Sequence, residues 1–176
     1  AAVLLPWTLY QCYGDLRVLE EQYPSMKAWI GYLRGQSQEY LFAGETCFGD
    51  WLAIDIPQGD CGRAPTPRDL ICTAYFARCA EIMAEVAKRL GKAGDATRYR
   101  ALHRRVKAAF QREFVAPSGR VVGDTQTGYL LALGFDLLPQ KQRAYALERL
   151  VTDIERRGWK LSTGFVGTPL LAPVLT

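Results

Sequence analysis

The chain has 176 residues, enough for one ordinary domain whose core removes roughly 70% of the unfolded surface from water. Hydrophobic residues at 49% and charged residues at 23% are typical of folded proteins and exclude intrinsic disorder, collagen-like repeats and low-complexity arrays. The 22 basic and 18 acidic residues give a net charge of +4, and because the two signs are interspersed we expect no nucleic-acid partner. The sequence therefore predicts a single domain over residues 1–176.

Two helices are predicted at the start of the chain. The first covers about residues 6–13 and ends at Gly14. From Asp15, the predicted N-cap, to Gly35, the predicted stop, apolar residues recur at alternating steps of three and four, as on one helix face. These residues are Leu16, Leu19, Tyr23, Met26, Ile30 and Leu33. Pro24 predicts a kink or break in this helix, because proline removes a backbone donor and clashes with the preceding turn.

The strongest periodic pattern predicts a helical hairpin in the middle of the chain. Asp69 is expected to cap its first helix, Gly91 and Gly94 to end it, and Asp95 to cap the second helix. The first apolar stripe consists of Cys72, Tyr75, Phe76, Cys79, Ile82, Met83, Val86 and Leu90. The facing stripe consists of Tyr99, Leu102, Val106, Phe110 and Phe114. A short turn between the two helices implies an antiparallel pair.

Two further helices are predicted at residues 125–133 and 140–157, and residues 120–122 are the only short strand candidate. The apolar residues expected to face inward on the last helix are Ala144, Leu147, Leu150, Val151 and Ile154. Roughly six antiparallel helices predict an all-α fold. The pattern leaves two architectures open, a solenoid of helical hairpins and part of an (α/α) toroid.

The five cysteines are odd in number and have no C-x-x-C spacing, so neither a closed disulfide framework nor a zinc site is predicted. They are Cys12, Cys47, Cys61, Cys72 and Cys79, and we expect them to be reduced. No stretch approaches about 20 uninterrupted apolar residues, and the first residues lack the features of a signal peptide. We therefore expect no membrane association and a cytoplasmic location.

Residues 44–69 form a long stretch without regular periodicity, which compact domains use when the loop has a function. Within it, the carboxylates of Glu45 and Asp50 lie close in sequence to Trp51. Carboxylates accept hydrogen bonds from sugar hydroxyls or move protons, and an indole face stacks on the C–H face of a pyranose. The alternative is that Asp50 caps a short helical turn and Trp51 fills the core.

A second candidate segment covers residues 162–169. Its glycines, Gly164 and Gly167, allow the backbone to approach a neighbour or a ligand, and Thr168 followed by proline predicts the start of a helix. Nucleotide chemistry has no support, because no phosphate-binding glycine motif is present. The only histidine, His103, is expected to be a packed and hydrogen-bonded residue, which leaves Ser/His/Asp and Cys/His catalysis without a base.

Four short motifs occur in a fixed order along nearly the whole chain. They are VLLPWTLY at residues 3–10, YGD at 13–15, GDWL at 49–52 and STGFVGT at 162–168. As a set they resemble the catalytic domain of bacterial α-L-rhamnosidases, glycoside hydrolase family seventy-eight. Because the chain begins without methionine and ends just after a helix-start signal, we expect an internal fragment of about half of that domain.

The resemblance implies an (α/α)6 toroid whose central cavity binds a terminal L-rhamnose and cleaves it from a rhamnose-containing glycoside by inversion. In that family the general acid belongs to a motif before the Pro-Trp segment and the base to a region after the Gly-Thr helix, so no catalytic residue is assigned in this chain. No cofactor or metal is implied. By motif match, Trp51 is expected to contact the sugar and Asp50 to position the loop or a sugar hydroxyl.

The isolated chain is expected to be inactive and to self-associate through apolar helix faces at Leu4, Leu5, Leu170 and Leu171. Two alternatives remain at this point. One is another glycan-processing enzyme with the same toroid, and the other is a helical-repeat scaffold that binds proteins. A pocket around Trp51 favours an enzyme, whereas a concave surface without a pocket favours the scaffold.

Overall fold

The computed structural model describes residues 1–42, 48–55 and 64–176. Within these ranges the fold is built from helices, as predicted, with one two-stranded antiparallel hairpin. The helices are α1 (Leu4–Tyr13), α2 (Arg17–Gly35), α3 (Arg68–Arg89), α4 (Ala93–Phe114), α5 (Gln126–Gly134), α6 (Gln140–Arg156), the 3-10 helix η1 (Thr168–Leu170) and α7 (Leu171–Leu175). The strands are β1 (Ser37–Gln38) and β2 (Leu41–Phe42).

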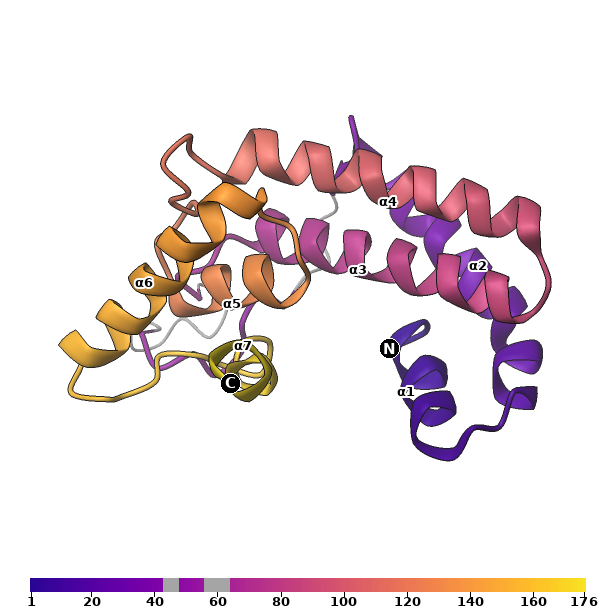
Figure 1. The fold of residues 1–176 in the computed structure, drawn as a ribbon, viewed down its shortest axis with the longest axis horizontal. Helices are drawn as coiled ribbons and strands as arrows, with labels where there is room; N and C mark the ends of the chain where they lie inside the picture. Colours follow the sequence, from indigo (N-terminus) through magenta and orange to yellow (C-terminus); the bar gives the residue numbers. More distant parts are fainter. Residues whose placement is uncertain (43–47, 56–63) are drawn as a thin grey trace.

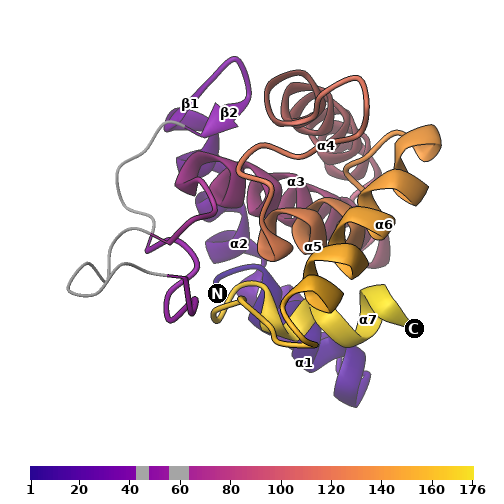
Figure 2. The ribbon, with the colours of Figure 1, turned by 90° about the vertical axis from the view of Figure 1, so that its left-hand side faces the viewer.

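The helices form two layers. Contacts join α1 to α2, α3 to α4 and α5 to α6, so consecutive helices pack as hairpins. Contacts also join α1 to α3, α3 to α5 and α5 to α7, which makes the odd-numbered helices a continuous inner layer. Figures 1 and 2 show α4 along one side of α3, with α1 and α7 on the opposite side. An inner row of helices backed by an outer row is the arrangement of part of an (α/α) toroid.

Helix α3 is the centre of the core, because it contacts α1, α2, α4 and α5. The centre of its predicted stripe is buried, and so are residues on its other faces. The additional buried residues are Leu70, Ile71, Thr73, Ala74, Ala77, Ala80, Ala84 and Ala87. Small alanine side chains let neighbouring helices approach α3 closely. A single predicted stripe therefore understates the burial of this helix.

The predicted helix ends differ from the observed ones by about two residues. Helix α2 begins at Arg17, whose backbone N–H donates to Asp15 Oδ1 at 3.0 Å, and it continues through Pro24 without interruption. Asp69 and Asp95 lie in the first turns of α3 and α4 and are not their N-cap residues. A carboxylate in the first turn still interacts favourably with the positive end of the helix dipole, so its position in sequence alone does not identify the cap.

The inward face of α6 is the clearest correction to the predicted packing. Leu150 and Ile154 are buried as predicted, and Ala146 is buried with them, whereas Ala144 and Leu147 are exposed. Residues 144, 147 and 151 and residues 146, 150 and 154 are two apolar stripes at helical spacing. Helix α6 packs mainly against α5, so only one of these stripes is covered.

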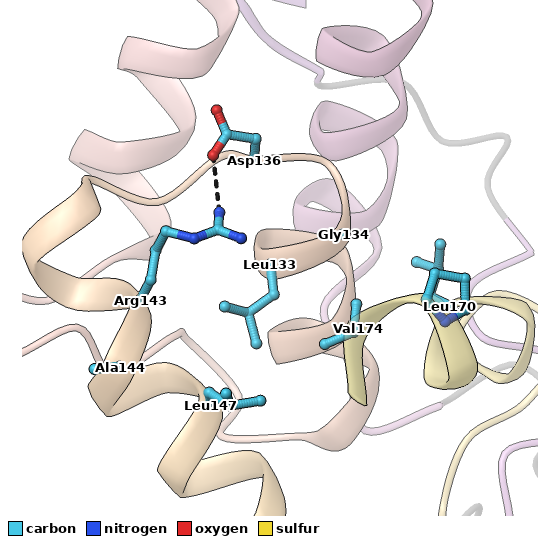
Figure 3. Close-up of a pocket in the computed structure, with 9 residues that line it drawn as sticks. Leu133, Gly134, Asp136, Arg143, Ala144, Leu147, Leu170 and Val174 are labelled. Carbon is cyan, nitrogen blue, oxygen red and sulfur yellow. Dashed lines mark hydrogen bonds and ion pairs between the residues drawn. The ribbon is translucent and has the colours of Figure 1, made fainter. Parts of the chain in front are cut away.

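Ala144 and Leu147 line a cavity of about 420 Å³ between α5, α6 and α7, and Val151 is partly buried. Figure 3 shows Leu147 and Leu133 facing this cavity, with Val174 of α7 on the other side. An ion pair between Arg143 and Asp136, 2.8 Å long, closes one edge of it. Leu147 therefore lines this cavity and lies outside the core.

The described residues also bear on the predictions about the short strand, the cysteines and membrane-spanning helices. Val121 forms an isolated antiparallel bridge with Val115 in the region of the predicted strand. Cys12 and Cys79 are free thiols, Cys72 is partly buried, and Cys47 and Cys61 lie outside the described residues. No helix in the described ranges combines the length and the apolar character needed to cross a bilayer.

Candidate functional site

Three connections that lead from an outer helix to an inner helix meet at one end of the molecule, which faces the viewer in Figure 2. They are residues 36–67 before α3, of which 36–42, 48–55 and 64–67 are described, residues 115–125 before α5, and residues 157–167 before η1. The hydroxyls of Thr66 and Thr125 are hydrogen-bonded at 2.7 Å, and Arg157 pairs with Asp55 at 2.9 Å. A hydrogen bond and an ion pair therefore join the connections to one another.

Asp50 is the centre of this junction. Its side chain is almost completely buried, since only 1% of the residue surface is exposed. Oδ1 accepts hydrogen bonds from the backbone N–H groups of Val166 at 2.8 Å and Gly167 at 3.3 Å. Oδ2 accepts hydrogen bonds from Gly164 N–H at 2.8 Å and from the Thr127 hydroxyl at 2.5 Å. Both oxygens are thus filled by protein donors, which compensates the buried charge.

Gly164 is required by the close approach of the two connections. A Cβ atom at this position would lie 2.2 Å from the carbonyl oxygen of Trp51 and 2.6 Å from that of Asp50. The backbone N–H of Phe165 donates to the carbonyl oxygen of Trp51 at 2.9 Å, which continues the contact. Gly167 is equally constrained, because its Cβ atom would lie 2.3 Å from the Thr127 hydroxyl. The predicted close backbone approach at both glycines is confirmed. At both positions the neighbour is another segment of the protein and not a ligand.

Trp51 does not fill the core. Its side chain is 49% exposed and stacks on Phe165, which is 63% exposed, with ring centroids 5.5 Å apart and planes at 25°. We call these two side chains the Trp51–Phe165 pair. Phe165 is a site candidate that the sequence did not single out, although it lies between two glycines within the motif at residues 162–168. An aromatic residue next to glycines in a loop motif is the sequence signal that could have identified it.

A second set of polar contacts anchors the connections to α5 and α6. Gln126 accepts a hydrogen bond from Ser162 N–H at 2.9 Å. Asp124 accepts hydrogen bonds from the Tyr129 hydroxyl and from Arg149, both at 2.6 Å. Burial acts to raise the pKa of Asp124, but these hydrogen bonds outweigh it and hold the pKa below its usual value. Burial, with the hydrogen bond to Asp124, raises the pKa of Tyr129 to about 12. The carboxylate therefore stays charged and keeps its partners at neutral pH.

A polar cavity of about 240 Å³ lies at the junction, lined by Asp50, Asp55, Asp124, Thr127 and Arg157 among others. Glu45, the other carboxylate of the first candidate segment, lies outside the described residues. In the described ranges, no group of three or more His, Cys, Asp or Glu side chains has the arrangement of a metal site. The junction thus combines a carboxylate whose two oxygens accept hydrogen bonds from the protein, a polar cavity and an exposed aromatic pair.

His103 lies elsewhere in the fold. One ring nitrogen is 3.0 Å from the carbonyl oxygen of Ala77, which joins α4 to α3. The residue is partly buried, so the predicted packed and hydrogen-bonded histidine is confirmed.

The whole sequence matches a known protein family with a helical-hairpin fold. Residues 1–176 match the family described as the bacterial alpha-L-rhamnosidase 6 hairpin glycosidase domain. The chain belongs to this family. The described hairpins of this chain are α1–α2, α3–α4 and α5–α6, and the predicted fold class is confirmed.

The curated relatives of this chain are much longer proteins. It is 46% identical over 176 residues to an alpha-L-rhamnosidase of Streptomyces avermitilis, covering 100% of this chain and 16% of that protein. It is 42% identical over 180 residues to an alpha-L-rhamnosidase of Alteromonas sp. (strain LOR), covering 99% of this chain and 19% of that protein. The chain therefore spans less than one fifth of the length of these relatives.

Two solved structures show the same fold. The alpha-L-rhamnosidase of Streptomyces avermitilis, complexed with L-rhamnose, superposes with a TM-score of 0.89 at 45% identity, over 99% of this chain and 16% of that chain. The enzyme from Aspergillus terreus superposes with a TM-score of 0.93 at 35% identity, over 99% of this chain and 20% of that chain. The chain therefore has part of the six-hairpin glycosidase fold, and the alternative prediction of a helical solenoid is excluded.

Proposed function

We propose that the full-length protein is an α-L-rhamnosidase that removes terminal α-L-rhamnose from glycosides by inversion, and that this chain builds part of its sugar site. Family membership over residues 1–176 supports the activity, and the relative from Streptomyces avermitilis was solved in complex with L-rhamnose. The observation that carries the site is the exposed Trp51–Phe165 pair at the junction of the three connections.

In this proposal the Trp51–Phe165 pair supplies an apolar wall for the C–H face of the sugar. Asp50 acts as a positioning residue, because both of its oxygens already accept hydrogen bonds from protein donors. An inverting pair needs two carboxyl groups about 6.5–9.5 Å apart with a water molecule between them. A buried carboxylate without a free oxygen does not meet that need, and we assign the acid and base to neither Asp50 nor any other residue of this chain.

The activity is tested with the full-length protein and an aryl α-L-rhamnoside. We expect hydrolysis in which β-L-rhamnose is the first product, seen by proton NMR before mutarotation. The isolated chain of residues 1–176 should show no turnover under the same conditions. Retention of the α-anomer would contradict the inverting mechanism. Turnover by the monomeric chain that disappears on changing Asp50 would instead place the chemistry in this chain.

The role of the aromatic pair is tested by Trp51→Ala in the full-length protein. Loss of the stacking surface should weaken rhamnose binding and lower kcat/KM by about 5- to 30-fold, which corresponds to about 1–2 kcal/mol. Because Trp51 is half exposed, the free energy of unfolding should change by less than about 1 kcal/mol. Steady-state kinetics and thermal unfolding measure the two effects separately.

Two matched variants sharpen this test. Trp51→Phe keeps an aromatic face and should retain most of the affinity, whereas Phe165→Ala should imitate Trp51→Ala, since the rings stack on each other. A lower unfolding temperature together with unchanged kcat/KM of the folded fraction would show that Trp51 is only structural.

The expectations about partners and location stay predictions. Of the apolar residues expected to drive self-association, Leu5 is exposed, while Leu4, Leu170 and Leu171 are partly buried. We propose that the isolated chain self-associates through the face of α1 that bears Leu5, and that the full-length protein acts in the cytoplasm without a nucleic-acid or membrane partner.

A further inference from the structure

A groove of about 340 Å³ lies between α2 and α4, two helices of the outer layer (Figure 1). It shares no lining residue with the junction around Asp50. The residues that line it are Lys27, Ile30, Gly31 and Arg34 of α2, Arg98, Tyr99, Ala101, Leu102 and Arg105 of α4, and Tyr40 of the turn between β1 and β2. No carboxylate is among these residues, so the lining is apolar and cationic.

Both helices present the same pattern to the groove. On α2 a cation at Lys27 is followed by small or aliphatic residues three and four positions later and by a cation at Arg34. On α4 the corresponding cations are Arg98 and Arg105, again with aliphatic residues between them. Seven residues of helix span about 10.5 Å. Each rim of the groove therefore carries two cations about two helical turns apart above an aliphatic floor.

The floor is open at Gly31. A Cβ atom built at this position has no other atom within 4 Å. Glycine in a helix interior lowers helix stability by about 1 kcal/mol relative to alanine, and no close packing requires it at this position. The open floor leaves room for an apolar side chain of a bound segment.

The positive charge is concentrated at one end of the groove. Asp95 lies 3.6 Å from Lys27 Nζ and 3.3 Å from Arg98 Nη1, which neutralises part of the charge at that end. At the other end, no carboxylate among the described residues forms an ion pair with Arg34 or Arg105. The Arg105 guanidinium donates to the Tyr40 hydroxyl at 2.9 Å and lies 5.7 Å from its ring centroid. An anionic partner is therefore favoured at the Arg34–Arg105 end.

We propose that this groove docks an acidic amphipathic helix of a partner protein, with its carboxylates on the cationic rims and an apolar side chain over Gly31. Helices that bind in grooves present apolar anchors at i, i+3 and i+4, which matches the aliphatic floor. A carbohydrate is a poorer match, because the Tyr40 ring is already covered by Arg105 and Tyr99 is buried, so neither ring offers an open face for stacking. Charge complementarity selects an acidic peptide over a neutral one.

The test uses the full-length protein and a synthetic 16-residue helical peptide. The peptide carries two Glu residues seven positions apart on one face, with Leu three and four positions after the first Glu. We expect micromolar binding in isothermal titration calorimetry at low salt, weakened at least tenfold at 0.5 M NaCl, because exposed charges are screened. A control peptide with Gln in place of both Glu residues should bind at least tenfold more weakly.

Three protein variants locate the site. The double variant Arg34→Glu, Arg105→Glu should weaken peptide binding at least 100-fold. Arg104→Glu, an exposed change on α4 outside the groove, should leave it unchanged. Gly31→Met fills the floor and should weaken binding at least tenfold without lowering the unfolding temperature, since methionine favours the helix over glycine. Rhamnoside turnover should be unchanged in all variants, so this test does not depend on the proposed enzymatic function.

Three results would overturn the proposal. Equal binding of the Gln control peptide would show that acidic residues are not recognised. Unchanged binding by Gly31→Met would show that the peptide does not occupy the groove. Tighter binding of heparin or of a DNA duplex than of the acidic peptide, lost in the Arg34→Glu, Arg105→Glu variant, would assign the groove to a polyanion and not to a protein helix.

Discussion

Replacing Asp50 by alanine in the full-length protein is expected to lower kcat/KM by about 100-fold or more, because misplacement of a site by about 1 Å can cost that much. The carboxylate holds the backbone N–H groups of Gly164, Val166 and Gly167, and the Thr127 hydroxyl. Its removal leaves these buried donors unpaired, at a cost of about 1–3 kcal/mol each before relaxation. The measurements are kinetics with an aryl rhamnoside and chemical unfolding, which should show a loss of at least about 3 kcal/mol.

Matched variants separate positioning from proton transfer at Asp50. Thr127→Val removes one of the four donors and keeps the side-chain shape, so its effect on kcat/KM should stay below about tenfold. Asp50→Asn keeps the side-chain shape, but its NH2 group is a hydrogen-bond donor that would face the donors now bound by the carboxylate. Activity and the free energy of unfolding should therefore fall together. Loss of all activity in Asp50→Asn with native stability would instead indicate a proton-transfer role. Native activity and stability in Asp50→Ala would contradict the positioning role.

The largest effect on stability is expected at Phe110, which is fully buried in the α3–α4 hairpin. Its ring packs against Phe114 with centroids 5.3 Å apart. Phe110→Ala should lower the free energy of unfolding by about 3–5 kcal/mol, because the apolar transfer energy is lost and a cavity remains. Urea-induced unfolding followed by circular dichroism measures this change.

Phe48 provides the control for this prediction. It is 88% exposed, so Phe48→Ala should change the free energy of unfolding by no more than about 0.5 kcal/mol. A change below about 1 kcal/mol for Phe110→Ala would show that the core of the α3–α4 hairpin collapses around the substitution or is not built as described.

The helices were predictable from the sequence because a helical face depends on local spacing. The alternating steps of three and four over α3 and α4 specify a hairpin whose inward residues, such as Met83 and Phe110, are fully buried. The same spacing failed on α6, where residues such as Leu147 and Leu150 belong to different apolar stripes. Only the neighbouring helix α5 decides which stripe is covered, and no local pattern contains that information.

The candidate site was likewise predictable from the sequence only in part. By itself, the sequence determined that Asp50 and Trp51 lie in a non-helical segment and that glycines surround Phe165, since these are properties of neighbouring residues. The tertiary structure alone decided that Asp50 accepts the backbone hydrogen bond of Gly164, 114 positions away, and that the two rings stack. The reason is geometric: outer helices that run in the same direction bring the connections before α3, α5 and η1 to one end. There, residues remote in sequence complete each other's hydrogen bonds.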